Sequence, residues 1–379
     1  MRIAFLGKGG SGKTTTSASF IRHAAKSRPF VLAIDADVNA HLAGALAFEG
    51  QISQLGQLYA PLTNYLKGTR SDLGDKPMIM TTPPSTSSNF VRCNSDDQLV
   101  QKYALQKGNI ALFTVGKYEQ EDVGSSCYHG KLSGAISVLH HLLDGANDVV
   151  VADNTAGTDA VATSLWFAYD MRVVVVEPSK KSVQVYKDFI ALLPELAATT
   201  YVVGNKVEGA EDEAFLKAQI GEDRLLGFIP LSRHMKRFEQ GDTDALDKFQ
   251  EEQSQVFDRI LSTLMSQKRD WDVYLSRLRQ THTKLCRDWY DAYYGLKLDE
   301  GLDMTFTYQA AIASATVTSV GSIANAATSD DNTVDVVTVD ATTPDAPNQD
   351  PLSQSVSADA AQAAPTPAVE VQPVPPDKG

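Results

Sequence analysis

A glycine-rich stretch near the amino end constrains this chain more than any other feature. Residues 7–15 read Gly-Lys-Gly-Gly-Ser-Gly-Lys-Thr-Thr, after the apolar run Ile3–Leu6 and before a segment with helical spacing of its apolar residues. This is the context of a phosphate-binding loop, because glycine lets backbone N–H groups converge on phosphate oxygens and a helix N-terminus attracts anions. We expect Lys13 to reach the β- and γ-phosphates of a nucleoside triphosphate, and the Thr14 hydroxyl to bind Mg²⁺.

A second lysine, Lys8, follows the first glycine, where an ordinary loop of this kind requires no particular side chain. The stretch resembles the deviant Walker A signature of the class that contains MinD, ParA, the nitrogenase iron protein and the arsenite ATPase. The resemblance implies an ATP-dependent homodimer that hydrolyses ATP, with Lys8 reaching the partner subunit's phosphates, where a cation stabilises charge in phosphoryl transfer. A solvated surface lysine is the alternative. The nucleotide contacts implied by the resemblance are Gly9, Gly10, Ser11, Gly12, Lys13, Thr14, Thr15, Asn205 and Lys206.

Two acidic residues, Asp35 and Asp37, follow the buried-strand run Phe30–Ile34. Carboxylates at the carboxyl end of a parallel strand lie where α/β folds bind ligands, and this pair suits Mg²⁺ and water positioning beside a triphosphate. The pattern resembles switch I of the same class, which implies that Asp37 activates the attacking water and that Asp35 contributes to the Mg²⁺ site. In the alternative interpretation both residues cap the next helix.

Two later strands end in further candidate residues. The apolar run Val149–Ala152 leads to Asp153 and then Asn-Thr-Ala-Gly, which resembles a Walker B strand whose aspartate holds Mg²⁺ through a water. Asn205 and Lys206 end the run that begins at Thr200. Asn205 resembles the base-reading asparagine of the class, whose amide pairs with adenine N6 and N7, although it would also suit a turn that ends the strand.

A short block, Cys127-Tyr128-His129, lies just before the helix that precedes the Walker B strand. Its position resembles that of a Cys-Tyr-Cys pair in CooC-type ATPases, which help insert nickel into carbon monoxide dehydrogenase and bind metal at their dimer interface. Here histidine replaces the second cysteine, so two copies of the chain would supply a Cys₂His₂ set for Zn²⁺ or Ni²⁺. A metal-free dimer contact and an unrelated role are the alternatives.

Strands alternating with helices predict a doubly wound, mostly parallel α/β sheet of the P-loop NTPase type over residues 1–265. Beyond it we expect a helical extension over residues 266–310 and a disordered tail over residues 311–379. Residues 320–379 hold 8 of the 16 prolines and nine acids against one lysine, so most of the net charge of −13 belongs to the tail. Such a composition is typical of disorder.

The helical extension has an apolar seam of 4-3-4-3 spacing that begins at Phe257 and continues past Trp289, interrupted by Lys268 and His282, with Gly295 as the expected stop. The seam fits either a helix packed along its own domain or a coiled-coil contact with a partner. Residues 50–108 carry no pattern to which we assign chemistry.

The remaining composition excludes several classes of protein. Three widely spaced cysteines form no disulfide framework, which favours a reducing compartment. The four apolar residues before the glycine loop are too few for a signal-peptide core, and no apolar run suffices to span a membrane. Residues 266–297 carry seven basic and four acidic side chains, too mixed to indicate nucleic-acid binding. We therefore expect a cytoplasmic protein without a strong nucleic-acid or membrane signal.

The sequence leads to one preferred function and two alternatives. The preferred function is a dimeric ATP-hydrolysing switch that resembles metallocentre-maturation ATPases, with a metalloenzyme or other protein as client. The alternatives are a positioning ATPase of the ParA/MinD type and a nucleotide-gated interaction scaffold with little turnover.

Overall fold

An eight-stranded sheet forms the centre of the computed structural model, which describes residues 1–122, 128–155, 163–242 and 244–315. All neighbouring strands are parallel except the edge strand β4, which pairs antiparallel with β5. Across the sheet the order is β10 (Leu225–Pro230), β9 (Thr200–Val207), β8 (Met171–Val176), β1 (Arg2–Gly7), β7 (Val149–Asn154), β2 (Val31–Ala36), β5 (Ile110–Thr114) and β4 (Leu105–Lys107). The predicted mostly parallel α/β fold is confirmed.

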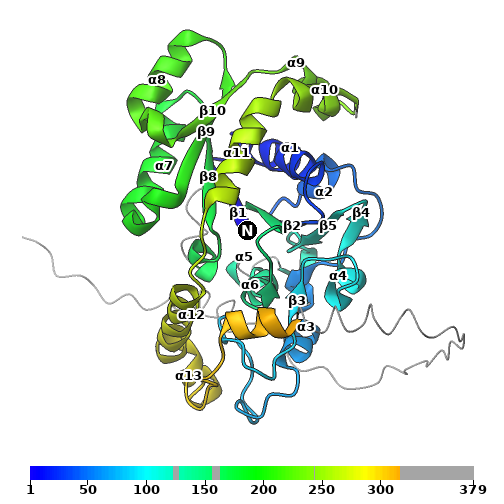
Figure 1. Cartoon of the computed structure of the whole chain (residues 1–379), viewed down its shortest axis with the longest axis vertical. Coiled ribbons are helices and arrows are strands. Elements are labelled where there is room, and N and C mark those ends of the chain that lie inside the picture. Colours follow the sequence, from blue (N-terminus) through cyan, green and yellow to red (C-terminus); the bar gives the residue numbers. More distant parts are fainter. Residues whose placement is uncertain (123–127, 156–162, 243, 316–379) are drawn as a thin grey trace, which may run out of the picture.

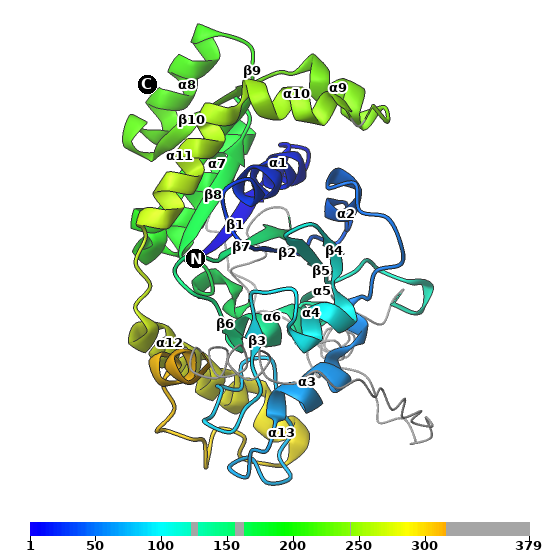
Figure 2. The ribbon, with the colours of Figure 1, turned by 45° about the vertical axis from the view of Figure 1, so that its right-hand side comes forward.

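Helices cover both faces of this sheet (Figures 1 and 2). Successive side chains of a strand point to opposite faces, so Phe5 of β1 packs with Phe20 and Phe257, whereas Leu6 packs toward Tyr186 and Phe189. The helices are α1 (Lys13–Ala25), α2 (Leu42–Ala45), α3 (Tyr59–Lys67), α4 (Gln98–Tyr103), α5 (Tyr128–Lys131), α6 (Ser133–His140), α7 (Lys180–Leu192), α8 (Ala210–Ile220), α9 (Arg233–Glu239), α10 (Asp244–Glu252), α11 (Ser254–Ser266), α12 (Trp271–Leu285) and α13 (Asp291–Tyr294).

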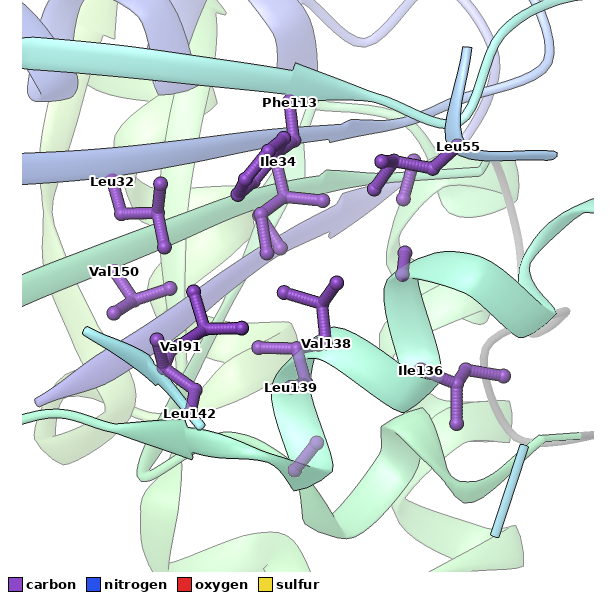
Figure 3. Close-up of a cluster of buried hydrophobic side chains, with 14 of the residues drawn as sticks. Leu32, Ile34, Leu55, Val91, Phe113, Ile136, Val138, Leu139, Leu142 and Val150 are labelled. Carbon is purple, nitrogen blue, oxygen red and sulfur yellow. The ribbon is translucent and has the colours of Figure 1, made fainter. Parts of the chain in front are cut away.

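The largest apolar cluster lies between the sheet and α6. Figure 3 shows side chains of β2 and β5, among them Ile34 and Phe113, above the side chains of α6, among them Val138 and Leu139. A two-stranded parallel sheet, β3 (Val91–Arg92) with β6 (Leu142–Leu143), adds to this cluster. Every labelled side chain in this view is fully or almost fully buried, so α6 is held firmly under the central strands.

Residues 69–92 pack against residues 267–315, and the sequence predicted no chemistry for either segment. We call residues 69–92 together with residues 267–315 the distal lobe; it includes α12 and α13 and lies in Figure 1 at the end of the molecule opposite α8–α10. Lys76 Nζ donates to the carbonyl of Glu300 over 2.6 Å, and the rings of Phe90 and Phe306 stack with centroids 5.8 Å apart. Each segment therefore covers apolar surface of the other.

The apolar seam of the extension is covered by this chain itself within the described residues. The helix is interrupted between α11 and α12, and Phe257 packs on the main sheet, whereas Leu278 packs within the distal lobe. Trp289 is 49% exposed and leaves the seam. The arrangement corresponds to packing along the protein's own domain and not to a continuous coiled coil, while Gly295 ends α13 with φ +65° as expected.

The carboxyl end of the described chain is also helical. Residues 308–315 form a helix, so the helical part extends five residues past the expected boundary at residue 310. Ala311 and Ile312 of this helix pack against the apolar cluster of the distal lobe that contains Leu278 and Phe306. Residues 316–379, the rest of the predicted tail, lie outside the described residues. Within the described part, no helix has the length and hydropathy required to cross a membrane.

Candidate nucleotide-binding site

The glycine loop connects the buried strand β1 to α1, as its pattern predicts. Gly7 ends β1 and pairs in register with Val175, and α1 begins at Lys13. Gly10 and Gly12 have φ of +83° and +88°, a region that other residues avoid. The loop closes on itself through a hydrogen bond from the Ser11 N–H to the Lys8 carbonyl, 3.0 Å long. Its backbone is therefore already curved around the start of α1.

Lys13 holds together the carboxylates of two different strands. Its Nζ lies 2.9 Å from Asp37 Oδ2 and 2.8 Å from Asp153 Oδ1. The strands bring the acids together because β2 and β7 pair in register, with Asp35 opposite Asp153. Burial opposes ionisation of the lysine, but the two carboxylates outweigh it and raise the pKa of Lys13. The ammonium is thus charged and positioned beside the loop.

The two carboxylates respond differently to the same lysine. Burial favours the neutral form of Asp37, yet Lys13 and the N–H groups of Asn39 prevail and lower its pKa. Asp153 is fully buried, and desolvation outweighs the attraction of Lys13, so the pKa of Asp153 is raised. Asp37 is therefore the stronger candidate for a permanently ionised group at the site.

Asp153 and Thr14 suit the predicted Mg²⁺ site. The second carboxylate oxygen, Asp153 Oδ2, is buried and has no hydrogen-bond partner in the protein. The Thr14 hydroxyl lies near the same carboxylate and favours its ionised form. Mg²⁺ usually binds through one or two carboxylates or hydroxyls together with waters and substrate phosphates. An unpartnered carboxylate oxygen beside a hydroxyl fits that requirement.

Asp35 has a backbone role in this structure. Its two oxygens accept the N–H of Leu42 over 2.9 Å and the N–H of Asp37 over 3.2 Å, so Asp35 holds the start of α2, as the capping alternative expected of it. Asp37 bonds Asn39 and Lys13 and does not cap α2. Burial and the nearby Asp153 raise its pKa to about 7. A contribution of Asp35 to Mg²⁺ binding remains a prediction.

Asn205 and Lys206 contact the loop from β9. The Asn205 amide donates to the Ser11 carbonyl over 2.7 Å, and Lys206 Nζ donates to the Gly10 carbonyl over 2.7 Å. Lys206 has φ +58°, which is uncommon for a residue with a side chain, and it also pairs with Glu177 at 2.7 Å. Glu177 had no predicted role; its position directly after β8 was the available signal. Base recognition by Asn205 remains a prediction.

Alanine substitutions at two loop glycines separate backbone strain from steric contact. A Cβ at Gly12 would lie 2.2 Å from Asn205 Nδ2, whereas a Cβ at Gly10 meets nothing within 4 Å, although both positions have positive φ. We expect Gly10→Ala to lower the free energy of unfolding by about 1 kcal/mol through strain alone. Gly12→Ala should cost about 1–3 kcal/mol more, because Asn205 must give up its bond to Ser11. Denaturant unfolding of the nucleotide-free proteins measures both, and equal losses would contradict this contact.

Comparisons with known proteins identify the family of this chain. The family model of the CobQ/CobB/MinD/ParA nucleotide-binding domain matches residues 3–243. This chain belongs to that family. It is 30% identical to the ATP-binding protein MJ0823 of Methanocaldococcus jannaschii over 63% of this chain and 88% of that protein. It is 26% identical to the carbon monoxide dehydrogenase accessory protein CooC of Rhodospirillum rubrum, over 65% of this chain and 90% of CooC. A ParA family ATPase structure from Chlorobium tepidum aligns with a TM-score of 0.46, at 15% identity, over 69% of this chain and 96% of that one.

Lys8, the residue that distinguishes the deviant Walker A signature, lies at the edge of the loop in this member of the CobQ/CobB/MinD/ParA family. Lys8 is partly exposed, and no described residue bonds its ammonium group. Gly9 is exposed and Thr15 is partly exposed on the first turn of α1. These positions leave the loop surface open to solvent in the single chain.

The Cys-Tyr-His block is only partly described. Cys127 lies outside the described residues, as does the side chain of His129. Tyr128 begins α5 and is buried, and its ring lies 6.0 Å from that of Tyr118. Among the described residues no group of three or more His, Cys, Asp or Glu side chains is arranged to hold a metal ion. Metal binding by Cys127 and His129 therefore stays a prediction.

Proposed function

We propose that the protein is an ATP-hydrolysing switch whose site is set by the bridge from Lys13 to Asp37 and Asp153. This bridge is the observation on which the proposal depends. It places one buried cation between the end of the glycine loop and two carboxylates from neighbouring strands, with distances of 2.9 and 2.8 Å. A triphosphate arriving at the loop offers Lys13 new anionic partners, and the carboxylates that it releases become available for water and metal.

Each residue has a distinct task in this proposal. Asp37 accepts two N–H bonds from Asn39, which favour its charged form after Lys13 has turned to the triphosphate, so it can accept a proton from, or orient, a water molecule. The N–H groups of the loop and the positive end of α1 bind phosphate oxygens. Asp153 and Thr14 would hold Mg²⁺, which neutralises charge that develops on the phosphates. Asn205 and Lys206 position the loop from the side of β9.

We further propose that ATP joins two copies of the chain, with Lys8 acting on the partner's nucleotide. The support is the sequence Lys-Gly-Gly-Ser-Gly-Lys-Thr and the partly exposed Lys8 without a bond to described residues. We expect Asp37→Ala with ATP to elute as a dimer in size-exclusion chromatography and Lys8→Ala/Asp37→Ala with ATP to elute as a monomer. Lys26→Ala/Asp37→Ala, changed at an exposed lysine just after α1, should still form the dimer. A persistent monomer of Asp37→Ala, with ATP binding shown separately, would sink the dimeric switch.

For the client of the switch we propose a metalloenzyme centre. The support is the similarity to CooC together with the position of Cys127-Tyr128-His129 just before α6. Two chains would supply two thiolates and two imidazoles, a set that suits Zn²⁺ or Ni²⁺. We expect elemental analysis of the purified dimer to find about one metal ion per two chains, and Cys127→Ser to lose it, while Cys286→Ser, at a buried cysteine of the distal lobe, should retain it. Equal metal content in wild type and Cys127→Ser would exclude this client class but leave the ATP switch intact.

A further inference from the structure

The hydroxyl group of Tyr128 is a buried hydrogen-bond donor without an acceptor. Tyr128 begins α5 and is 9% exposed, and its side chain belongs to the same apolar cluster as Val115 and Leu132. Its hydroxyl oxygen is buried and has no hydrogen-bond partner within the part of the chain that the structure describes. Buried hydroxyl groups are nearly always hydrogen-bonded, because burial without a partner costs free energy. Such a hydroxyl points to a partner from outside the chain.

The helix that carries Tyr128 lies at the carboxyl edge of the sheet. The Val115 N–H, directly after β5, donates to the Asp35 carbonyl over 2.8 Å, and the Gly56 N–H donates to the Val115 carbonyl over 3.0 Å. Gly56 also adjoins α5, since a Cβ there would lie 2.9 Å from the Val115 carbonyl oxygen and 3.0 Å from Lys131 Cβ. α5 is therefore next to the carboxyl ends of β2 and β5, where the acids of the nucleotide site lie.

Three carboxylates of the nucleotide site act on this hydroxyl. Burial raises the pKa of Tyr128, and the negative charges of neighbouring acids, Asp35, Asp37 and Asp153 among them, raise it further. The hydroxyl therefore keeps its proton and remains a donor. None of the three carboxylates accepts a direct hydrogen bond from it. Polar groups that face each other beyond hydrogen-bond distance are commonly bridged by water, so a water between Tyr128 and these acids would satisfy the hydroxyl.

The arrival of a triphosphate gives such a water a role. Without nucleotide, Lys13 Nζ bonds Asp37 Oδ2 and Asp153 Oδ1, and in the proposed function it turns to the phosphates. Asp37 Oδ1 keeps its two N–H bonds from Asn39, while Oδ2 becomes available as an acceptor. A water that donates to Asp37 Oδ2 and accepts from Tyr128 has one lone pair left for the γ-phosphorus. Two hydrogen bonds would then fix the direction of that lone pair.

We propose that Tyr128 is a positioning residue for ATP hydrolysis, whose hydroxyl donates to the attacking water while Asp37 accepts a proton from it. The water oxygen forms a bond to the γ-phosphorus, the bond from this phosphorus to the β,γ-bridging oxygen breaks, and its electron pair leaves with ADP. The proton lost by the water passes to Asp37, and Tyr128 keeps its own proton. This role rests on the proposed ATPase function and is independent of metal binding at Cys127 and His129.

Tyr128→Phe removes the hydroxyl and keeps the ring, and it tests this role in the full-length protein. We expect kcat for phosphate release to fall about tenfold or more, because the attacking water loses its orientation. KM for ATP, and the Kd of a non-hydrolysable ATP analogue in isothermal titration calorimetry, should change less than about threefold, because the hydroxyl bonds water and not the nucleotide. Tyr186→Phe is the matched control and should keep the wild-type kcat. Tyr186 is also 9% exposed, but it lies on α7, where the charges that act on it are those of Arg224 and Asp223.

Urea unfolding without nucleotide gives a readout that separates this role from a structural one. We expect the midpoint of Tyr128→Phe to equal or exceed that of wild type, because an unpartnered buried hydroxyl contributes no bond to the folded state. A lower midpoint would reveal a partner within the protein and overturn the proposal. A wild-type kcat in Tyr128→Phe, or a loss confined to nucleotide affinity, would overturn it as well. Absence of phosphate release from the wild-type protein would refute the proposed function, and this role with it.

Discussion

Replacing Asp144 with alanine is expected to lower the free energy of unfolding by about 3–5 kcal/mol, the usual cost of leaving a buried charge without its partner. Asp144 follows β6 and is fully buried, and its Oδ1 accepts from Arg2 over 2.7 and 2.9 Å. Arg269, just before α12, adds two bonds of 2.8 Å to the same carboxylate. Without Asp144 the guanidinium of Arg2, itself fully buried, keeps only carbonyl and hydroxyl partners.

Asp223→Ala is the matched control for this prediction. Asp223 also pairs with an arginine, Arg224, at 3.0 Å, but the aspartate side chain is 74% exposed. Exposed pairs of this kind contribute about 0–1 kcal/mol. Denaturant unfolding followed by circular dichroism compares the two variants with wild type. Losses of similar size would show that the buried network around Asp144 does not hold the extension on the sheet.

The ion pairs of Asp144 with Arg2 and Arg269 should stabilise the folded state less as the pH falls. Burial favours the neutral form of Asp144, but the charges of Arg2 and Arg269 prevail and hold its pKa well below the usual value of 3.8. The folded state therefore binds fewer protons here than the unfolded state, and the stabilisation is complete above about pH 4. It is lost as the pH falls through the folded-state pKa. We expect Asp144→Ala to show a weaker loss of stability below pH 4 than wild type in urea titrations at several pH values.

Lys13→Ala is expected to reduce phosphate release from ATP at least about 100-fold, the usual loss when one preorganised charge or donor is removed from a transition state. The variant also leaves the carboxylates of Asp37 and Asp153 beside each other without the cation that now bridges them. The combined negative charge of these two carboxylates then repels a triphosphate bound at the glycine loop. Malachite-green detection of released phosphate provides the measurement.

The control for Lys13→Ala is Lys102→Ala, at an exposed lysine on α4 that contacts the ring of Tyr103. This variant should release phosphate at the wild-type rate. If Lys13→Ala and wild type released phosphate equally slowly, hydrolysis would be absent from this chain. A nucleotide-gated scaffold with little turnover would then replace the proposed ATPase.

The arrangement of the nucleotide site followed from short-range patterns in the sequence. A buried strand, a loop with three glycines at positive φ and a helix that begins at Lys13 depend on residues within about 25 positions of one another. The apolar run before Asp153 predicted a parallel strand, and parallel strands bring their carboxyl ends to one edge. The sequence thus predicted Asp37 and Asp153 at the same edge of the sheet as the glycine loop, but not their direct bonds to Lys13, and the backbone bonds of Asp35 were only one of two alternatives.

The regions that sequence reasoning could not place depend on contacts between distant positions. The 4-3-4-3 seam showed that one face of the extension is apolar, but periodicity does not identify what covers the face. The cover turned out to be this chain's own sheet for Phe257 and the distal lobe for Leu278. Likewise Arg2 gave no signal, since its partner Asp144 lies 142 positions away in the chain, and Arg269, which binds the same carboxylate, lies 267 positions from Arg2.

The sequence alone thus determined the local machinery of this protein: the strand–loop–helix unit, its lysine and the carboxylates at the ends of later strands. Glycine conformations, apolar runs and strand direction depend on nearby residues, and together they determine where the residues of the nucleotide site lie. Only the tertiary structure decided where the extension rests and that Asp144 joins Arg2 to Arg269. The physical reason is that burial and charge pairing are set by which distant segments meet, and no residue pattern within a single segment specifies its partner.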